Sequence, residues 1–68
     1  MSEEIQLQKK NSNQYCYVNF HSEAGKIVVE MDFVEYNPET EENTPIIKTK
    51  EDIAGLNKFL KDKNWIVC

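Results

Sequence analysis

Residues 14–36 read QYCYVNFHSEAGKIVVEMDFVEY, and this stretch decides the fold. β-Branched and aromatic residues alternate with polar ones on both sides of a short central segment, SEAG. In the first half, an alternation with a period of two places Cys16, Val18 and Phe20 on one face of a strand. Gly25 is free to adopt the positive φ that a tight turn needs. The stretch therefore predicts a β-hairpin.

The second half of the chain predicts one helix over residues 50–62, followed by a short strand over residues 65–68. Residues 49–52, TKED, have the form of a capping box with Thr49 as N-cap, in which Asp52 replaces the usual Glu. The apolar side chains that follow recur at helical spacing and would form one buried stripe: Ile53, Leu56, Phe59 and Leu60. We expect the last strand to return beside the hairpin.

These elements predict a single small α+β domain spanning the 68 residues. The hairpin 14–36 and the C-terminal strand would form a small antiparallel sheet, with the helix 50–62 packed on one face. For residues 1–13 three alternatives remain open: an edge strand through Ile5 and Leu7, a frayed helical turn, or no order. The expected core is Val18, Phe20, Ile27, Val29, Met31, Phe33, Ile53, Leu56, Phe59, Leu60 and one of Trp65 or Ile66.

The charge of the chain is concentrated in one segment. Twelve acidic residues stand against eight basic ones, all lysine, which gives a net charge of −4. Residues 37–45, NPETEENTP, predict a loop. Residues 35–45 hold four carboxylates and no lysine, so the rest of the chain is balanced. This acidity, with no arginine, argues against general affinity for nucleic acid or for an anionic membrane.

The composition also indicates a cellular compartment for the protein and the kind of genome that encodes it. Cys16 and Cys68 are the only cysteines, no signal peptide is recognisable, and no apolar run is long enough to span a bilayer. We therefore expect a cytoplasmic protein with reduced thiols. The abundance of Lys, Asn and Ile without Arg indicates an AT-rich coding sequence, which favours a phage or mobile-element protein.

The sequence gives little support for a catalytic or metal-binding site. Cys16 and His21 are five residues apart on one predicted strand, so their side chains point to opposite faces. Glu30 and Asp32 share a strand face, but a solvated face explains them better than a carboxylate pair in a cleft. No Cys, His or Asp spacing matches a zinc or calcium site. We expect no catalytic residues, no metal and no cofactor, and therefore a non-enzymatic protein.

The sheet face away from the helix is the candidate site. Tyrosines on this face would be exposed contact anchors for a partner protein, with nearby carboxylates as an electrostatic rim. The anchors are Tyr15, Tyr17 and Tyr36, and the rim is Glu30, Asp32, Glu39, Glu41 and Glu42. The alternatives are that the N-terminal segment or a second copy, as a homodimer, covers this face, and that the acidic loop only aids solubility.

The function that follows is a small protein-interaction module that binds and modulates a host protein. The alternative is a weak nucleic-acid-binding protein that uses the lysines concentrated between positions 48 and 63: Lys48, Lys50, Lys58, Lys61 and Lys63.

Overall fold

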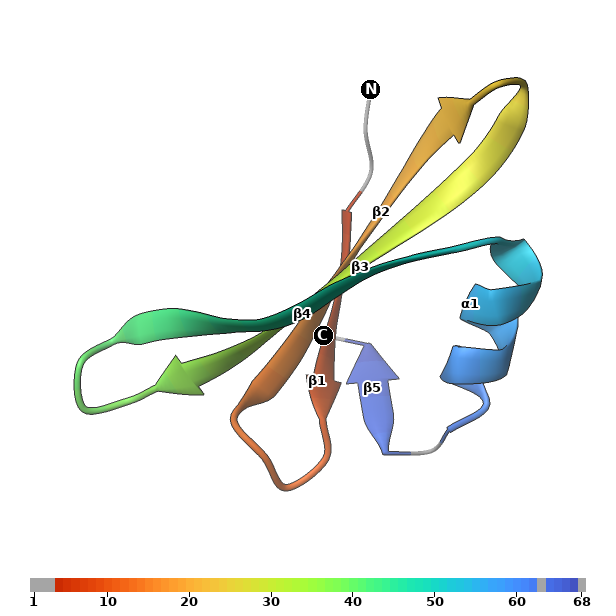
Figure 1. Ribbon diagram of the computed structural model, residues 1–68. Coiled ribbons are helices and arrows are strands. Elements are labelled where there is room, and N and C mark those ends of the chain that lie inside the picture. Colours follow the sequence, from red (N-terminus) through yellow and green to blue (C-terminus); the bar gives the residue numbers. More distant parts are fainter. Residues whose placement is uncertain (1–3, 63, 68) are drawn as a thin grey trace.

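A computed structural model describes residues 4–62 and 64–67, which form five strands and one helix. In chain order these are β1 (Glu4–Lys9), β2 (Gln14–Glu23), β3 (Lys26–Asn37), β4 (Glu42–Glu51), α1 (Ile53–Leu60) and β5 (Trp65–Val67). The strands make one antiparallel sheet in the order β4-β3-β2-β1-β5 (Figure 1). The α+β fold expected from the sequence is confirmed.

The β2–β3 hairpin has the predicted faces, but its turn is shorter than the expected connection Ser22–Gly25, because Ser22 and Glu23 pair with β3. Cys16 lies opposite Phe33 and Val18 lies opposite Met31, so the apolar residues of both strands share one face. The turn is made by Ala24 and Gly25, with φ of 50° and 76°. Two consecutive left-handed residues form the turn whose twist matches that of a hairpin.

The segment 37–45, expected to be a loop, is a second hairpin. β3 continues to Asn37, residues 38–41 turn, and β4 begins at Glu42. The Asn37 side-chain carbonyl accepts a hydrogen bond from the Glu39 amide at 3.0 Å, and Glu41 takes a φ of 58°. The prediction of a loop was wrong because these polar residues gain strand structure from pairing with β3, not from their own propensity.

β4 lies at the edge of the sheet and carries an irregularity. Phe33 pairs with Ile47 and Val34 with Pro45, which leaves Ile46 as the extra residue of a bulge. Proline lacks the amide hydrogen that a central strand would need, so an edge strand accommodates it. Bulge and proline both make this edge a poor template for further strand pairing.

The helix begins later and ends earlier than the predicted 50–62. β4 runs on to Glu51, and Thr49, the expected N-cap, is paired with Met31 inside this strand. Asp52 is the N-cap instead, and its side chain accepts a hydrogen bond from the Gly55 amide at 2.7 Å. The capping-box prediction was wrong because pairing with β3 holds Thr49 in an extended conformation.

The N-terminal segment forms an interior strand. β1 pairs with β2 on one side and with β5 on the other, and Leu7 has Cys16 and Val67 as its two partners. The last strand thus returns beside β1, not beside the predicted hairpin. Residues 1–3 of the segment left open above, and Cys68 of the predicted last strand, lie outside the described residues.

The core is smaller than expected and includes the N-terminal strand. Its buried side chains are Leu7, Cys16, Val18, Val29, Met31 and Leu56, with Phe20, Phe33, Phe59 and Trp65 partly buried around them. Ile27, Ile53 and Leu60 were expected inside but are 56%, 41% and 42% exposed. Ile53 and Leu60 are the first and last residues of the two-turn helix α1, and Ile27 lies at the start of β3, so all three lie at the ends of their elements.

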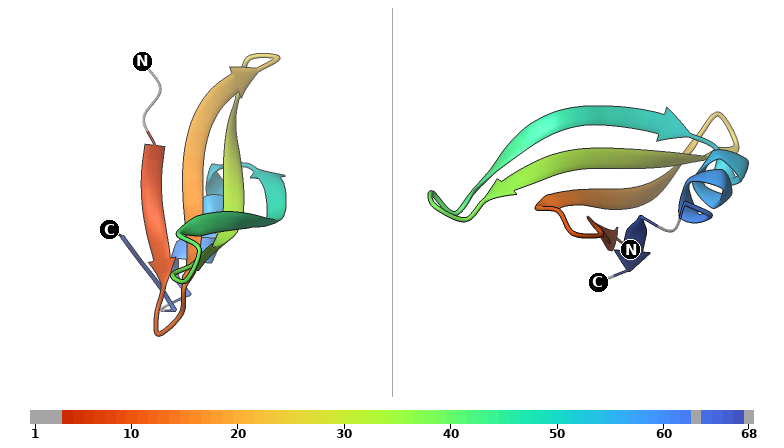
Figure 2. Two further views of the ribbon diagram at one scale, coloured as in Figure 1. Left: turned by 90° about the vertical axis from the view of Figure 1, so that its left-hand side faces the viewer. Right: turned by 90° about the horizontal axis from the view of Figure 1, so that it is seen from below.

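The molecule is elongated, measuring 43 × 23 × 20 Å along its principal axes. The β3–β4 turn lies at one end, and α1 and the β2–β3 turn lie at the other (Figures 1 and 2). The two ends lie far apart along the long axis, so they face different parts of the surroundings.

Candidate protein-interaction face

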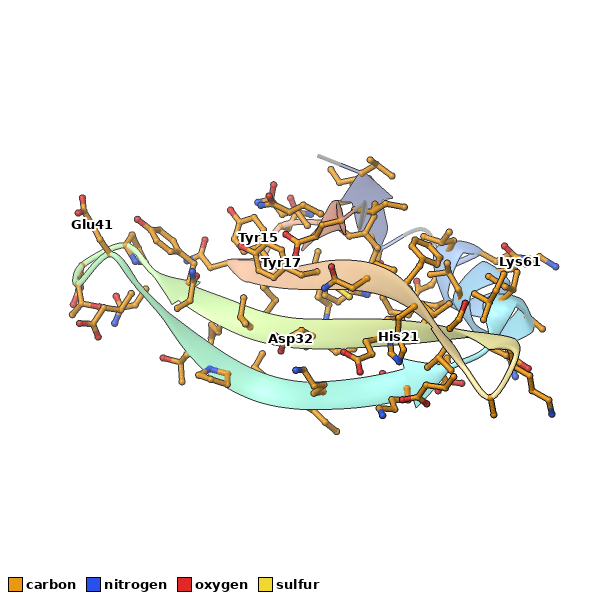
Figure 3. The ribbon with its side chains drawn as sticks, turned by 90° about the horizontal axis from the view of Figure 1, so that it is seen from above. Tyr15, Tyr17, His21, Asp32, Glu41 and Lys61 are labelled. Carbon is orange, nitrogen blue, oxygen red and sulfur yellow. The ribbon has the colours of Figure 1, made fainter. Side chains whose placement is uncertain are left out.

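The sheet face opposite α1, here called the open face, carries most of the polar strand residues. From β2 it receives Tyr15, Tyr17 and His21, and from β3 it receives Glu30 and Asp32. Figure 3 shows the labelled Tyr15, Tyr17, His21 and Asp32 on one side of the sheet. Strict alternation along β2 and β3 brings these residues together, as the sequence predicted.

The tyrosines occupy the part of the open face nearest the β3–β4 turn. Tyr15 pairs across the sheet with Val34, and Val34 is only 8% exposed although it lies on this open face. Tyr15, Tyr17 and Tyr36 are themselves half-buried. Each tyrosine thus offers part of its side chain from a position fixed by the strands, as anchor residues at protein interfaces do.

A charged cluster occupies the other part of the open face. The His21 Nε2 lies 3.2 Å from a Glu23 carboxylate oxygen, and the Lys50 Nζ lies 3.3 Å from the same oxygen. Hydrogen bonds from His21 and then Lys50 lower the pKa of the Glu23 carboxyl. The His21 Nε2 and the Lys50 Nζ each also lie 3.9 Å from a Glu30 carboxylate oxygen.

The two predicted rim carboxylates of β3 therefore have positive neighbours. Lys50 pairs across the strands with Glu30, and Lys48 pairs with Asp32. Lys48 and Lys50 offset part of the charge of Glu30 and Asp32, since Lys50 also pairs with Glu23, and this reduces the field of the two carboxylates beyond the surface. This balance follows from the β4 register, which the sequence analysis did not anticipate.

The acidic arm, defined as residues 35–44, is different. It is the part of the β3–β4 hairpin that extends past the last β2–β3 pair, Gln14 with Glu35. Within it only Tyr36 is half-buried, and every other residue is exposed. Its four carboxylates, at positions 35, 39, 41 and 42, have no lysine among them. Figure 3 shows Glu41 at the tip of this arm, far from the helix.

A hollow of about 350 Å³ lies at the base of the acidic arm. The residues that line it are Asn13, Glu35, Tyr36, Asn37, Pro38 and Thr44. Hydrogen-bond acceptors beside an aromatic ring suit a lysine or arginine head group. Asn13, Glu35 and Thr44 were not among the predicted site residues, because only the strand pairing brings them together.

The lysines proposed for nucleic-acid binding are divided between the two sides of the molecule. Lys48 and Lys50 lie in β4, where they pair with residues of the open face. Lys58 lies in α1 and Lys61 directly follows it, and α1 packs on the opposite face. Lys63 lies outside the described residues. The four described lysines of this set therefore do not lie on one face.

Other chemistry is sparse across the described residues. Cys16 is a free, buried thiol, and burial, reinforced by the Asp32 carboxylate, raises its pKa to about 11. Cys16 faces the core and His21 faces away from it, as the alternation predicted. Within residues 4–62 and 64–67 no cluster of three Cys, His or acidic residues could hold a metal ion, and no helix could cross a bilayer.

No protein-family model, curated protein or solved structure matches this chain.

Proposed function

We propose that this protein is a non-enzymatic interaction module that binds a basic surface of a partner protein through its acidic arm. Tyr15, Tyr17 and Tyr36 are the contact anchors beside the arm, and Glu39, Glu41 and Glu42 supply the charge. The composition favours a phage or mobile-element source, in which case the partner is a host protein that the module modulates.

One observation carries the proposal: the exposed acidic arm holds charge equal to the whole net charge of the chain, −4, and the other residues are balanced. A concentrated field at one end of an elongated molecule orients it during approach to a cationic partner and accelerates association. An arm that served only solubility would not need a tyrosine-lined hollow at its base.

The hollow and the tyrosines support a partner that presents lysine or arginine side chains. Glu35 and Tyr36 are consecutive in β3 and face opposite sides of the strand, so basic side chains at the base of the arm would meet the Glu35 carboxylate on one side and the Tyr36 ring, by a cation–π contact, on the other. Surface ion pairs alone contribute little, so the aromatic component is needed for measurable affinity. Weak nucleic-acid binding has less support, because the described lysines are divided between two faces.

The test uses a short oligoarginine peptide as the probe, with binding measured by fluorescence anisotropy at low and at physiological salt. The variant Glu41→Gln/Glu42→Gln removes two charges from the arm. We expect its dissociation constant to rise by roughly three- to tenfold, as two exposed charge pairs of about 0.3–0.7 kcal/mol each, within the usual range, would give. Added salt should weaken binding by the wild-type chain.

The matched control is Glu4→Gln/Glu51→Gln, which changes the net charge equally at exposed positions outside the arm. The proposal expects this control to bind within about twofold of wild type. Equal weakening of both variants would mean that only the overall charge matters, and the arm would lose its role. If the Tyr36→Ala variant bound the peptide as tightly as wild type, Tyr36 would not be part of the binding site.

A further inference from the structure

The acidic arm has two sides of different chemistry. Alternation along β3 puts Glu35 and Asn37 on one side of the arm and Tyr36 on the other. Across the hairpin, Asn43 pairs with Tyr36 and therefore lies on the same side as this ring. Glu42 pairs with Asn37 and therefore lies on the side of Glu35. The arm thus carries two of its carboxylates on the side of the sheet where α1 packs, and its one aromatic ring on the open face.

Tyr36 lies between two asparagines. Its amide donates a hydrogen bond to the Asn13 carbonyl at 2.8 Å, which continues the β2–β3 register by one residue. Asn13 thus flanks Tyr36 on the β2 side, as Asn43 does on the β4 side. Both asparagines are exposed, and Tyr36 is half-buried. An amide-bearing residue therefore stands on each side of Tyr36, one strand spacing of about 4.8 Å away.

Tyr17, another tyrosine of the open face, has different neighbours. It pairs with Asp32 on the open face, and Asp32 pairs in turn with Lys48 (Figure 3). A cationic side chain over Tyr17 would stand near the Lys48 ammonium, which repels it. The cross-strand row of Tyr36 holds no charged residue, so a cation can approach this ring without such repulsion.

We infer that the arm recognises arginine in preference to lysine, and that the Tyr36 ring provides this preference; the inference rests on the proposed function. A guanidinium group is planar and weakly hydrated, and it stacks on an aromatic ring while its five N–H donors point outward in its plane. Over Tyr36 these donors would be directed toward Asn13 and Asn43, whose side-chain carbonyls accept hydrogen bonds. A lysine ammonium is a compact, strongly hydrated charge, so it gains less on this uncharged row.

The test compares oligoarginine and oligolysine peptides of equal length, with dissociation constants measured by fluorescence anisotropy at the same low salt. The preference is the dissociation constant for oligolysine divided by that for oligoarginine. Carboxylates also favour arginine, so the informative quantity is the part of the preference that depends on Tyr36. Tyr36→Leu should reduce the preference about two- to fivefold, as loss of one exposed cation–π contact would give. Tyr36→Phe keeps the ring and should keep the preference.

Asn43→Ala, at an exposed position, removes one flanking amide without threatening the fold and should also lower the preference. The matched control is Tyr17→Leu, which removes a half-buried tyrosine from the row that holds Lys48 and should leave the preference as in wild type. Circular dichroism checks that each variant is folded.

Two results would overturn the inference while the proposed function stood: a wild-type preference of one, or a preference that Tyr36→Leu leaves unchanged. If the wild-type chain bound neither peptide, the proposed function itself would be contradicted, and this inference with it.

Discussion

Cys16 illustrates how burial determines the behaviour of one side chain. It lies on the core face of β2 with Leu7 and Phe33 as its cross-strand neighbours, and it is fully buried. Desolvation of the thiolate raises the pKa of this thiol to about 11 from an ordinary 9.0, and the Asp32 carboxylate adds to the effect. The thiol is therefore protonated and unreactive at neutral pH.

This pKa predicts a pH dependence of stability. Because the folded state holds Cys16 neutral, the resulting stabilisation is complete below pH 9.0 and declines as pH rises toward about 11. We expect the difference in free energy of unfolding between wild type and Cys16→Ala to shrink over this window. Urea denaturation at several pH values measures it. A difference that stays constant from pH 8 to pH 11 would contradict the assigned environment.

The helix start offers a second prediction at this scale. Asp52→Ala removes the acceptor for the Gly55 amide and should lower the free energy of unfolding by about 1 kcal/mol. Asp52→Asn keeps an acceptor and should restore most of it. Thr49→Val should be neutral or stabilising, because the Thr49 hydroxyl is buried without a partner among the described atoms. Thermal melts compare the three variants. A larger loss of stability for Thr49→Val than for Asp52→Ala would indicate that Thr49, and not Asp52, is the N-cap.

At the scale of elements, the sequence predicts the strands and helices that carry their own apolar pattern, and it does not predict those that are stabilised only by pairing with neighbours. β2, β3 and α1 carry their own period of apolar residues, so the sequence identifies them. β4 is exposed at nearly every position and has no such period. β1 is short and polar apart from Ile5 and Leu7. Both strands are held by their neighbours, and a single sequence does not contain the pairing that stabilises them.

The interior position of β1 predicts an asymmetry between its two aliphatic residues. Leu7 is fully buried between β2 and β5, whereas Ile5 is 36% exposed. Leu7→Ala should therefore lower the free energy of unfolding by about 3 kcal/mol, within the range for a buried leucine. Ile5→Ala, the matched control, should cost about 1 kcal/mol. Equal small losses in urea denaturation would mean that β1 is not an integral part of the core.

Only part of the candidate site can be predicted from the sequence, because the rest depends on strand pairing. Alternation along β2 and β3 brings the tyrosines, Glu30 and Asp32 to one face. The balancing of those two carboxylates required the β4 register, since Lys48 and Lys50 reach them only across the strands. The acidic arm was recognisable by composition, but its shape as an extended hairpin was not.

At the scale of the whole molecule, the unbalanced charge is concentrated at one end of the long axis. The arm at this end carries four carboxylates and no lysine, whereas the α1 end carries charges of both signs. Under the proposed function, recognition of a basic partner would use the acidic arm, and substitutions at the α1 end should leave it unchanged.

The most direct test of the arm as the binding site is an amide chemical-shift titration of the labelled protein with the oligoarginine peptide. The account predicts that the largest shifts fall on residues 35–44 and on Asn13, Tyr15 and Tyr17, and that they diminish as salt is added. The α1 end should show little change. Shifts of equal size over the whole surface, or shifts centred on α1, would contradict a binding site in the acidic arm.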